Sequence, residues 1–476
     1  MAIKAKLTTF DTTMIVVSLI IGIGIFRTPA MVAASARTPL LFYAAWILGG
    51  LAGFLGALTF AEIGGRFAKP GSYYKVVAES YNSTVAFMLN WANVIVLNGA
   101  GAAAVALIGA EYLTPIVFPG VTASRLQVQA TAAVIMLILL AINYIGIKTG
   151  AWAQNILSLL KIGMIAVIVA GAFVSTRAPL TTGSLPPERS WWLALGAAFI
   201  SVFYAYGGYQ NTINFGADVR NAKRNVPRAI FFGILIVLAC YLAINVAYVK
   251  ALGIPGVASA KLVAAETARA TFGGAGWLVV SLAIVISAMG FLNVTLMQIP
   301  RAYYAMAEDR TLPAAFQKVN PKTQTQEFGL AFLGGLILLS LFLLGTFENI
   351  INYVMFLDTL AVALVASTLF VLRRKARRAG EAYDGYRVPF GPVLPIVFIA
   401  FQLTVSVNVL LNKPREALYS ALFFGAGYPV FLIMRRFSRK QPPDLQTSAE
   451  MSKLGKTQEA DHDHDQPGAP GRRAQP

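Results

Sequence analysis

The sequence predicts an all-α protein that crosses a membrane about twelve times. The chain of 476 residues is 57% hydrophobic and only 13% charged, which is far too apolar for a soluble protein of this length. It contains about twelve apolar runs, and a helix needs about 20 such residues to cross the hydrocarbon core. Two of these runs, the first and the sixth, are interrupted by glycine pairs. These observations predict a polytopic membrane protein with two broken spans.

The first apolar run, residues 12–34, contains a helix-breaking stretch at its middle. Gly22 and Gly24 lie one residue apart and Pro29 follows, and each glycine costs about 1 kcal/mol in an exposed helix. In lipid, a broken helix is tolerated only where its freed backbone groups face protein, a cavity or a ligand. A half-helix beginning near Ile25 presents unpaired N–H groups to an anion such as a carboxylate. The alternative is a glycine pair that allows close helix packing.

Spans two to five are expected at residues 40–66, 84–112, 128–147 and 152–174. The connection after span two is amphipathic, and it either lies on the membrane surface or re-enters the membrane. Span five carries Lys161 at its middle. A charge at that depth costs roughly 2.5–3.5 kcal/mol, so Lys161 requires a compensating partner unless it lies nearer the interface.

Span six begins near Trp191 and is broken at Gly207 and Gly208, which lie between aromatic residues and are followed by amides. The alternative to a break is that the two glycines allow close helix packing and that the aromatic residues lie at the membrane interface. If the first ten spans form two halves of five, spans one and six occupy matching positions. Paired broken spans are the sequence pointer to an inverted-repeat transporter site. The halves share no clear residue identity, so the repeat is predicted from the interruptions alone.

The remaining spans are expected at residues 230–249, 277–307, 330–344, 350–372, 393–411 and 418–434. Asp358, in span ten, is the one acidic residue well inside an apolar run, and it either pairs with a neighbouring helix or carries a proton. Spans eleven and twelve are expected to be scaffold or a dimer surface. Residues 1–436 then form the transmembrane transporter domain, and the polar residues 437–476 form a disordered cytoplasmic tail.

The basic charge balance indicates topology. The net charge is +18, but the basic residues lie in the short connections between apolar runs, so no nucleic-acid partner is expected. With the N-terminus inside, about two dozen Lys and Arg residues fall on the inner side and about nine on the outer. Both termini are therefore expected in the cytoplasm, with the chain in the cell inner (plasma) membrane. The first run is too long for a signal peptide.

Cysteine and histidine usage excludes several classes of site. Cys240 is the only cysteine and lies in an apolar run, which excludes disulfides within the chain. The two histidines, His462 and His464, lie in the tail. No nucleophile, base and metal cluster is present, so the sequence predicts neither an enzyme nor a metal or cofactor site.

Five motifs, in chain order, resemble the amino acid-polyamine-organocation superfamily. The resemblance is closest to the L-type amino acid transporters and the bacterial alanine-serine-cysteine exchangers, and it covers about residues 10–434. The motifs are Gly22-Ile23-Gly24-Ile25-Phe26; Ala61-Glu62-Ile63-Gly64 with Gly71-Ser72-Tyr73; Lys161; residues 204–214 with Arg224-Asn225-Val226-Pro227; and Asn293 with Arg301, Tyr303-Tyr304-Ala305-Met306-Ala307 and Leu312-Pro313.

The resemblance implies a five-plus-five inverted repeat with two extra spans, spans one and six being unwound. It places the substrate carboxylate at backbone N–H groups of Ile23 and Gly24, and the ammonium at carbonyls of Ile20, Tyr204 and Gly207. Tyr204 would be an aromatic gate. The implied substrate-binding set is Ile20, Gly22, Ile23, Gly24, Tyr204, Gly207, Tyr209 and Gln210, in which Tyr209 and Gln210 partly set side-chain specificity.

Lys161 matches a lysine that links the first and eighth spans of the family, near where sodium-coupled relatives bind an ion. Together with Ser287 of span eight it is expected to form the coupling or structural charge, which argues against sodium coupling. The chain departs from the family at Ile23, where a serine is usual, and at Arg27, which either favours anionic substrates or faces the outer vestibule. Residues 113–127 contain no cysteine, so no disulfide-linked heavy chain is expected.

These expectations add up to sodium-independent transport of neutral L-amino acids, by exchange or facilitated diffusion, through alternating access. Two alternatives stay open. One is a proton-coupled symporter of the same fold that uses Asp358 or the Lys161 proton. The other is a membrane sensor that binds amino acids without moving them. The expected partners are an amino acid and the lipid bilayer, with the oligomeric state open.

Overall fold

The computed structural model describes residues 3–439, apart from residues 23, 92, 94–97, 120–123, 176–178, 187, 189, 261, 344–346 and 413. In this part of the chain the regular elements are helices, and Leu7 and Val219 form an isolated β-bridge. The helices are α1 (Thr9–Ile20), α2 (Gly24–Ala36), α3 (Pro39–Arg66), α4 (Ser72–Ser80), α5 (Ser83–Trp91), α6 (Asn98–Val117), α7 (Arg125–Ile145), α8 (Ile147–Val174), α9 (Trp191–Ala205), η2 (Tyr209–Phe215), α10 (Ala222–Ser259), α11 (Val263–Phe272), η3 (Gly273–Ala275), α12 (Gly276–Glu308), η4 (Ala314–Gln317), α13 (Glu327–Leu343), α14 (Phe347–Arg378), α15 (Val393–Asn412) and α16 (Pro414–Arg439).

The helix lengths fit a polytopic membrane protein. Among the described residues, seven helices are long and apolar enough to cross a membrane, or eight if the bent pair α1 and α2 counts as one span. Shorter apolar helices lie within α9, α13 and α15. The count of twelve spans and the inverted repeat stay predictions.

Several helices begin where local sequence satisfies their first N–H groups. Thr8 caps α1 in a capping box with Asp11, and Ser124 caps α7 in the same way with Gln127. Thr38 caps α3, with proline at the first turn. Each cap supplies acceptors for N–H groups that have no partner inside the helix.

Both predicted interruptions are confirmed, and they lie against each other. α1 ends at Ile20 and α2 begins at Gly24, with a bend of 45° between them. α9 ends at Ala205, and the chain continues from Gly208 into the 3₁₀-helix η2. Gly208 has φ of +120°, and a Cβ atom on it would lie 2.2 Å from the carbonyl oxygen of Leu19. Only glycine allows this backbone approach.

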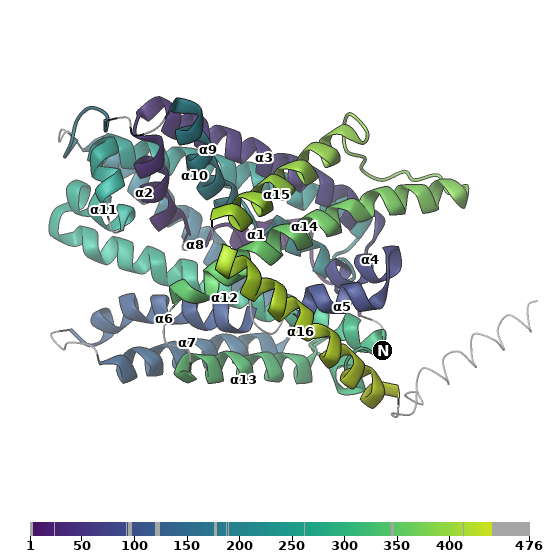
Figure 1. The fold of residues 1–476 in the computed structure, drawn as a ribbon. Coiled ribbons are helices and arrows are strands. Elements are labelled where there is room, and N and C mark those ends of the chain that lie inside the picture. Colours follow the sequence, from purple (N-terminus) through teal and green to yellow (C-terminus); the bar gives the residue numbers. More distant parts are fainter. Residues whose placement is uncertain are drawn as a thin grey trace, which may run out of the picture.

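The buried apolar residues form two hydrophobic cores. The larger core is contributed mainly by α1, α2, α3, α9 and α10, and the second by α6, α7, α12 and α13. α12 gives residues to both cores. In Figure 1, α6, α7 and α13 lie together along one edge of the molecule, with α12 between them and the helices of the larger core.

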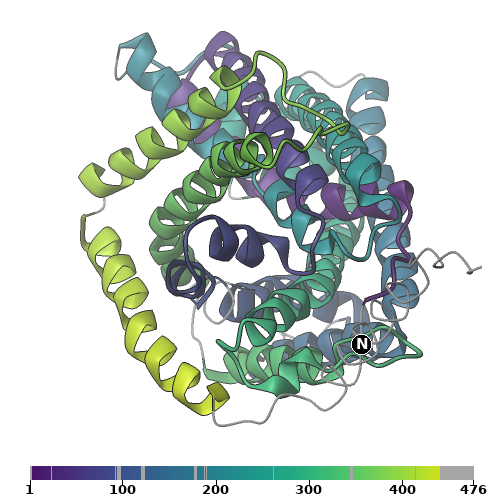
Figure 2. The ribbon, with the colours of Figure 1, turned by 90° about the vertical axis from the view of Figure 1, so that its right-hand side faces the viewer.

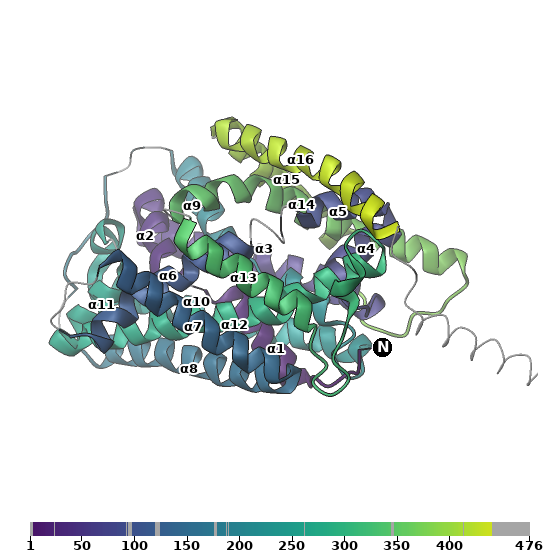
Figure 3. The same cartoon turned by 90° about the horizontal axis from the view of Figure 1, so that it is seen from below.

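The connection after span two forms α4, and this helix is packed inside the protein. Its residues 72–77 are buried, and it contacts η2, α12 and α14. Figure 2 shows this dark blue segment surrounded by the other helices. α4 follows Gly71, which has φ of +59° and would place a Cβ atom 2.4 Å from the carbonyl oxygen of Arg301. The last helices, α15 and α16, lie on the outside against α14 (Figure 3).

Candidate functional site

Lys161 of α8 reaches the break in the first span. Its ammonium donates hydrogen bonds to the carbonyl oxygen of Ile21 at 2.6 Å and to Ser18 Oγ at 3.0 Å. Lys161 is 1% exposed, so its ammonium is buried inside the protein. Ile21 follows the last residue of α1, where carbonyls lose their intrahelical partners. The charge is therefore compensated by unwound backbone.

α12 approaches the same ammonium through Gly290. A Cβ atom at this position would lie 3.0 Å from Lys161 Nζ and 2.9 Å from Ser18 Oγ. Ser287, one turn earlier, is fully buried, and its hydroxyl has no hydrogen-bond partner among the described residues. Lys161 thus hydrogen-bonds the first span and packs against α12, with Ser287 on the same helix.

Tyr241 of α10 connects the two breaks, and the sequence did not single it out. Its hydroxyl lies 3.1 Å from the carbonyl oxygens of both Ile20 and Ala205, which end α1 and α9. The Ile20 carbonyl also accepts from the Gly22 N–H at 2.9 Å. The available signal was a tyrosine within an apolar span that also contains Asn245 and Tyr248, since a buried tyrosine hydroxyl usually has a partner. Its target depends on the tertiary structure.

The beginning of α2 faces open space. A Cβ atom built on Gly22 meets nothing within 4 Å, and one on Gly24 meets only Thr28 Oγ1, at 3.7 Å. Gly24 itself is exposed. Ile23, predicted to bind a carboxylate, lies outside the described residues. The first N–H groups of a helix lack intrahelical acceptors, so this end of α2 can receive an anion.

In the second break, Gly207 is half-buried, and Tyr204 belongs to the last turn of α9, with its side chain outside the described part. Tyr209 is buried, and its ring lies edge-on to Phe60, with centroids 6.0 Å apart.

A Cβ atom on Gly56 would lie 1.9 Å from the Tyr209 hydroxyl, so the ring needs glycine there. Gln210 is buried and accepts a hydrogen bond from the Gly208 N–H at 2.8 Å through Oε1. In this conformation, the Gln210 side chain therefore stabilises the backbone at the break.

Asp358 is half-buried in α14 and interacts electrostatically with Tyr73 and Tyr209. The Tyr73 hydroxyl is buried and has no hydrogen-bond partner in the described part of the chain. No basic residue forms an ion pair with Asp358 among the described residues. Arg27 lies exposed on α2 and interacts electrostatically with Tyr112 of α6.

A buried ion pair joins α12 to the segment after η2, at the end of the molecule that carries the N-terminus. Arg301 of α12 binds Asp218, after η2, in a two-pronged contact of 2.5 Å from Nε and 3.1 Å from Nη2. The two side chains are 4% and 0% exposed. The Asp218 carbonyl also accepts from the N–H groups of Lys6 and Leu7, both at 2.8 Å. This contact ties the broken sixth span to α12 and to the N-terminal segment.

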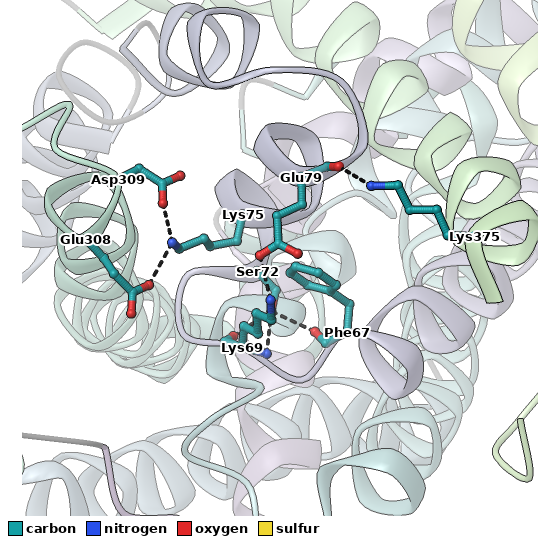
Figure 4. A network of polar contacts seen from close by, with 8 residues as sticks. All are labelled: Phe67, Lys69, Ser72, Lys75, Glu79, Glu308, Asp309 and Lys375. Atoms are coloured by element: carbon teal, nitrogen blue, oxygen red, sulfur yellow. Dashed lines mark hydrogen bonds and ion pairs between the residues drawn. The ribbon is translucent and has the colours of Figure 1, made fainter. Parts of the chain in front are cut away.

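A second ion cluster joins α4 to the end of α12 (Figure 4). Lys75, nearly buried, contacts Glu308 at 2.7 Å and also pairs with Asp309. Burial alone would lower the pKa of the Lys75 ammonium, but the two carboxylates outweigh it and raise that pKa. On the other side of α4, Lys375 donates to the Glu79 carbonyl oxygen at 2.5 Å. α4 is thus held between α12 and α14.

Another buried carboxylate, that of Glu62, lies near the end of α3. It accepts from Arg373 Nη2 at 2.5 Å, from Arg66 Nε at 2.7 Å and from the Val388 N–H at 2.7 Å. Glu62 belongs to a motif that the sequence singled out, but its partner Arg373 comes from a segment over 300 residues away. From the sequence, Arg373 is only one of the basic residues between apolar runs that indicate topology.

Comparison with known proteins agrees with the motifs. The amino acid permease family model matches residues 7–433. The chain is 29% identical to the serine/threonine exchanger SteT of Bacillus subtilis over 426 residues, covering 89% of this chain and 95% of that protein. It is 27% identical to the human b(0,+)-type amino acid transporter 1 over 423 residues, covering 87% and 84%. It is 26% identical to the human large neutral amino acids transporter small subunit 2 over 443 residues, covering 91% and 81%. The resemblance to the amino acid-polyamine-organocation superfamily is confirmed, and the chain belongs to the amino acid permease family.

Proposed function

We propose that this protein moves neutral L-amino acids across the membrane without sodium, by exchange or facilitated diffusion, through alternating access. The position of Lys161 carries the proposal. Its ammonium occupies the space between the end of α1 and Gly290 of α12, on the Ile21 carbonyl and Ser18 hydroxyl. Oxygen atoms of this kind are the ligands of a sodium ion in broken-helix transporters. A fixed positive charge replaces such an ion.

The substrate site of this proposal is the pair of breaks. The carboxylate binds the N–H groups of Ile23 and Gly24 beside Gly22, which the open space at the start of α2 supports. The ammonium binds carbonyls of Ile20, Tyr204 and Gly207. Tyr204 closes over the substrate, and Tyr209 and Gln210 shape the pocket for its side chain.

The Ile20 carbonyl already accepts two hydrogen bonds. Substrate binding there therefore requires the Tyr241 hydroxyl to turn to Ala205 alone. In this proposal Tyr241 lies next to the substrate. Its hydroxyl stops donating to the Ile20 carbonyl when the substrate ammonium binds there.

The two hydrophobic cores support alternating access. Packed cores move as units more readily than they deform, so the helices of the larger core can rock against α6, α7, α12 and α13. The Asp218–Arg301 and Lys75–Asp309 pairs cross between these groups. They would have to separate when this end of the molecule opens.

The location follows from the same proposal. The protein spans the plasma membrane many times, with both termini in the cytoplasm. It works without a disulfide-linked heavy chain, because its single cysteine, Cys240, lies within α10.

The test is uptake of labelled alanine into proteoliposomes in sodium-free buffer at equal pH, with and without unlabelled amino acid inside. Uptake that requires internal amino acid establishes exchange, and uptake in both conditions establishes facilitated diffusion. Labelled serine and threonine are tested in the same way, because the Bacillus relative is a serine/threonine exchanger. Uptake that needs sodium would contradict the role of Lys161.

A proton-coupled symporter is the second candidate, because Asp358 lies beside two tyrosines without an ion-pair partner among the described residues. It predicts accumulation driven by a pH gradient and abolished in Asp358→Asn. Tight substrate binding without flux would instead favour a sensor.

A further inference from the structure

A cavity lined by arginines lies at the end of α14. Its volume is about 440 Å³, and its walls are Phe370, Arg373, Arg374, Arg377, Arg378 and Pro392. It opens at the same end of the molecule as the N-terminus, because Arg373 binds Glu62 at the end of α3 and Lys375 binds Glu79 of α4. In Figure 1 the end of α14 and the N-terminus lie on the same side.

The positive charge in this cavity is only partly compensated. Arg373 is committed to Glu62 and to the Gly391 carbonyl oxygen. Arg374, Arg377 and Arg378 are exposed, and none of the three forms an ion pair or a hydrogen bond from its side chain among the described residues. A role in topology requires basic residues near the end of a span, but it does not require them to surround one cavity.

Exposed apolar residues lie close in the chain to Pro392, which lines the cavity. Phe390 is 81% exposed, and Val393 and Ile396, at the start of α15, are 54% and 53% exposed. Phe390 is held at a loop tip with φ of +55°. Aromatic and aliphatic side chains beside cationic groups match the boundary between headgroups and acyl chains. Binding of a soluble anion would not require these exposed apolar side chains.

We propose that the cavity binds the phosphodiester headgroup of an anionic phospholipid in the leaflet on the N-terminal side. Arg374, Arg377 and Arg378 hold the phosphate oxygens, since guanidinium groups bind phosphate through paired hydrogen bonds. Phe370 and Phe390 contact the glycerol and upper acyl chains. Because Arg373 links this site to Glu62, a bound lipid lies next to the ion pairs that join α14 to α3.

The experiment uses the full-length protein in detergent, titrated separately with phosphatidylglycerol, phosphatidylcholine and inorganic phosphate, with bound species counted by native mass spectrometry. The variant is Arg374→Gln with Arg377→Gln and Arg378→Gln. The matched control is Lys148→Gln with Lys318→Gln and Lys322→Gln, which removes the same charge from three exposed lysines elsewhere. Arg377→Gln alone is the second variant.

Wild type and control should bind phosphatidylglycerol equally and more tightly than phosphatidylcholine. At roughly fivefold per arginine, the triple cavity variant should bind it about a hundredfold more weakly, and the single variant about fivefold. Equal weakening in both triple variants, or unchanged binding in the cavity variant, would overturn the proposal. Inorganic phosphate binding as tightly as the lipid would make this a soluble-anion site and would also overturn it.

Alanine uptake by the same wild-type preparation is a separate readout. Failed uptake with lipid selectivity intact contradicts only the transport proposal, whereas intact uptake without lipid selectivity contradicts only the lipid site.

Discussion

At the scale of single residues, polar groups with buried partners decide how the broken spans are held. Lys161 donates to a carbonyl at the break of the first span, and Tyr241 joins the ends of α1 and α9. A buried donor removed from such a position leaves acceptors without partners, which costs about 1–3 kcal/mol or more. These two side chains therefore offer the sharpest tests of the site.

Lys161→Ala is expected to reduce amino acid flux at least about tenfold, because hydrogen bonds to a charged group contribute about 1.5–3 kcal/mol. The Ile21 carbonyl and Ser18 hydroxyl would lose their donor. Uptake is compared at equal amounts of folded protein, with Lys148→Ala, an exposed lysine, as control. Flux at the wild-type level in Lys161→Ala would remove the lysine from the mechanism.

Tyr241→Phe is expected to lower the melting temperature and to change apparent substrate affinity severalfold, because the Ile20 and Ala205 carbonyls share its hydroxyl. The control is Tyr248→Phe on the same helix. The Tyr248 hydroxyl is buried and has no hydrogen-bond partner among the described residues, so its loss should cost less than the loss at Tyr241. If the two variants behave alike in thermal unfolding and in uptake, Tyr241 does not connect the breaks.

At the scale of elements, the contact between the two broken spans depends on a glycine that neither span could reveal alone. Gly208 has a positive φ, and its α-carbon lies against the Leu19 carbonyl. The predicted break at the glycine pair of span six is confirmed. That its second glycine makes the close approach follows from where α1 passes.

Gly208→Ala is expected to destabilise the protein by about 1–3 kcal/mol through backbone strain, with a further clash against α1. The measurement is thermal unfolding together with uptake. Gly196→Ala in α9 is the control, since a Cβ atom there meets nothing within 4 Å. Normal stability and flux in Gly208→Ala would show that the backbone approach is dispensable.

At the scale of the whole molecule, the ion pairs at the N-terminal end join segments that lie far apart in the chain. Asp218 follows η2 and Arg301 lies in α12. Both are buried, so breaking the pair leaves an uncompensated charge and is strongly unfavourable, by about 3–5 kcal/mol. The Asp218–Arg301 pair is thus the most buried of several ion pairs that join segments at this end.

Asp218→Asn is expected to destabilise the protein by about that amount and to favour conformations open at the N-terminal end. Opening is read from alkylation of a cysteine introduced at Ser72, which is buried here, in the Cys240→Ala background. The control is Glu79→Gln, which breaks the exposed pair with Lys69 and should cost about 0–1 kcal/mol. Equal alkylation in both variants would argue against Asp218 as a closing contact.

Several features were readable from sequence because local chemistry determines them. Apolar runs long enough to cross lipid predicted helices, and the glycine pairs at Gly22, Gly24, Gly207 and Gly208 predicted two breaks, since glycine weakens a helix wherever it stands. The charge of Lys161 within span five predicted a compensating partner, because an uncompensated charge inside the membrane is energetically unfavourable. The ordered motifs predicted the family, which the comparison confirms.

Other features were decided by tertiary structure, because they join residues far apart in the chain. The partners of Lys161, the bridge made by Tyr241 and the pairing of Glu62 with Arg373 depend on which helices meet. The sequence predicts either a surface or a re-entrant position for the segment after span two, and the burial of this segment as α4 depends on packing against η2, α12 and α14. Sequence determines where a helix forms or breaks, through propensity and hydropathy. Which polar group satisfies each break depends on long-range packing.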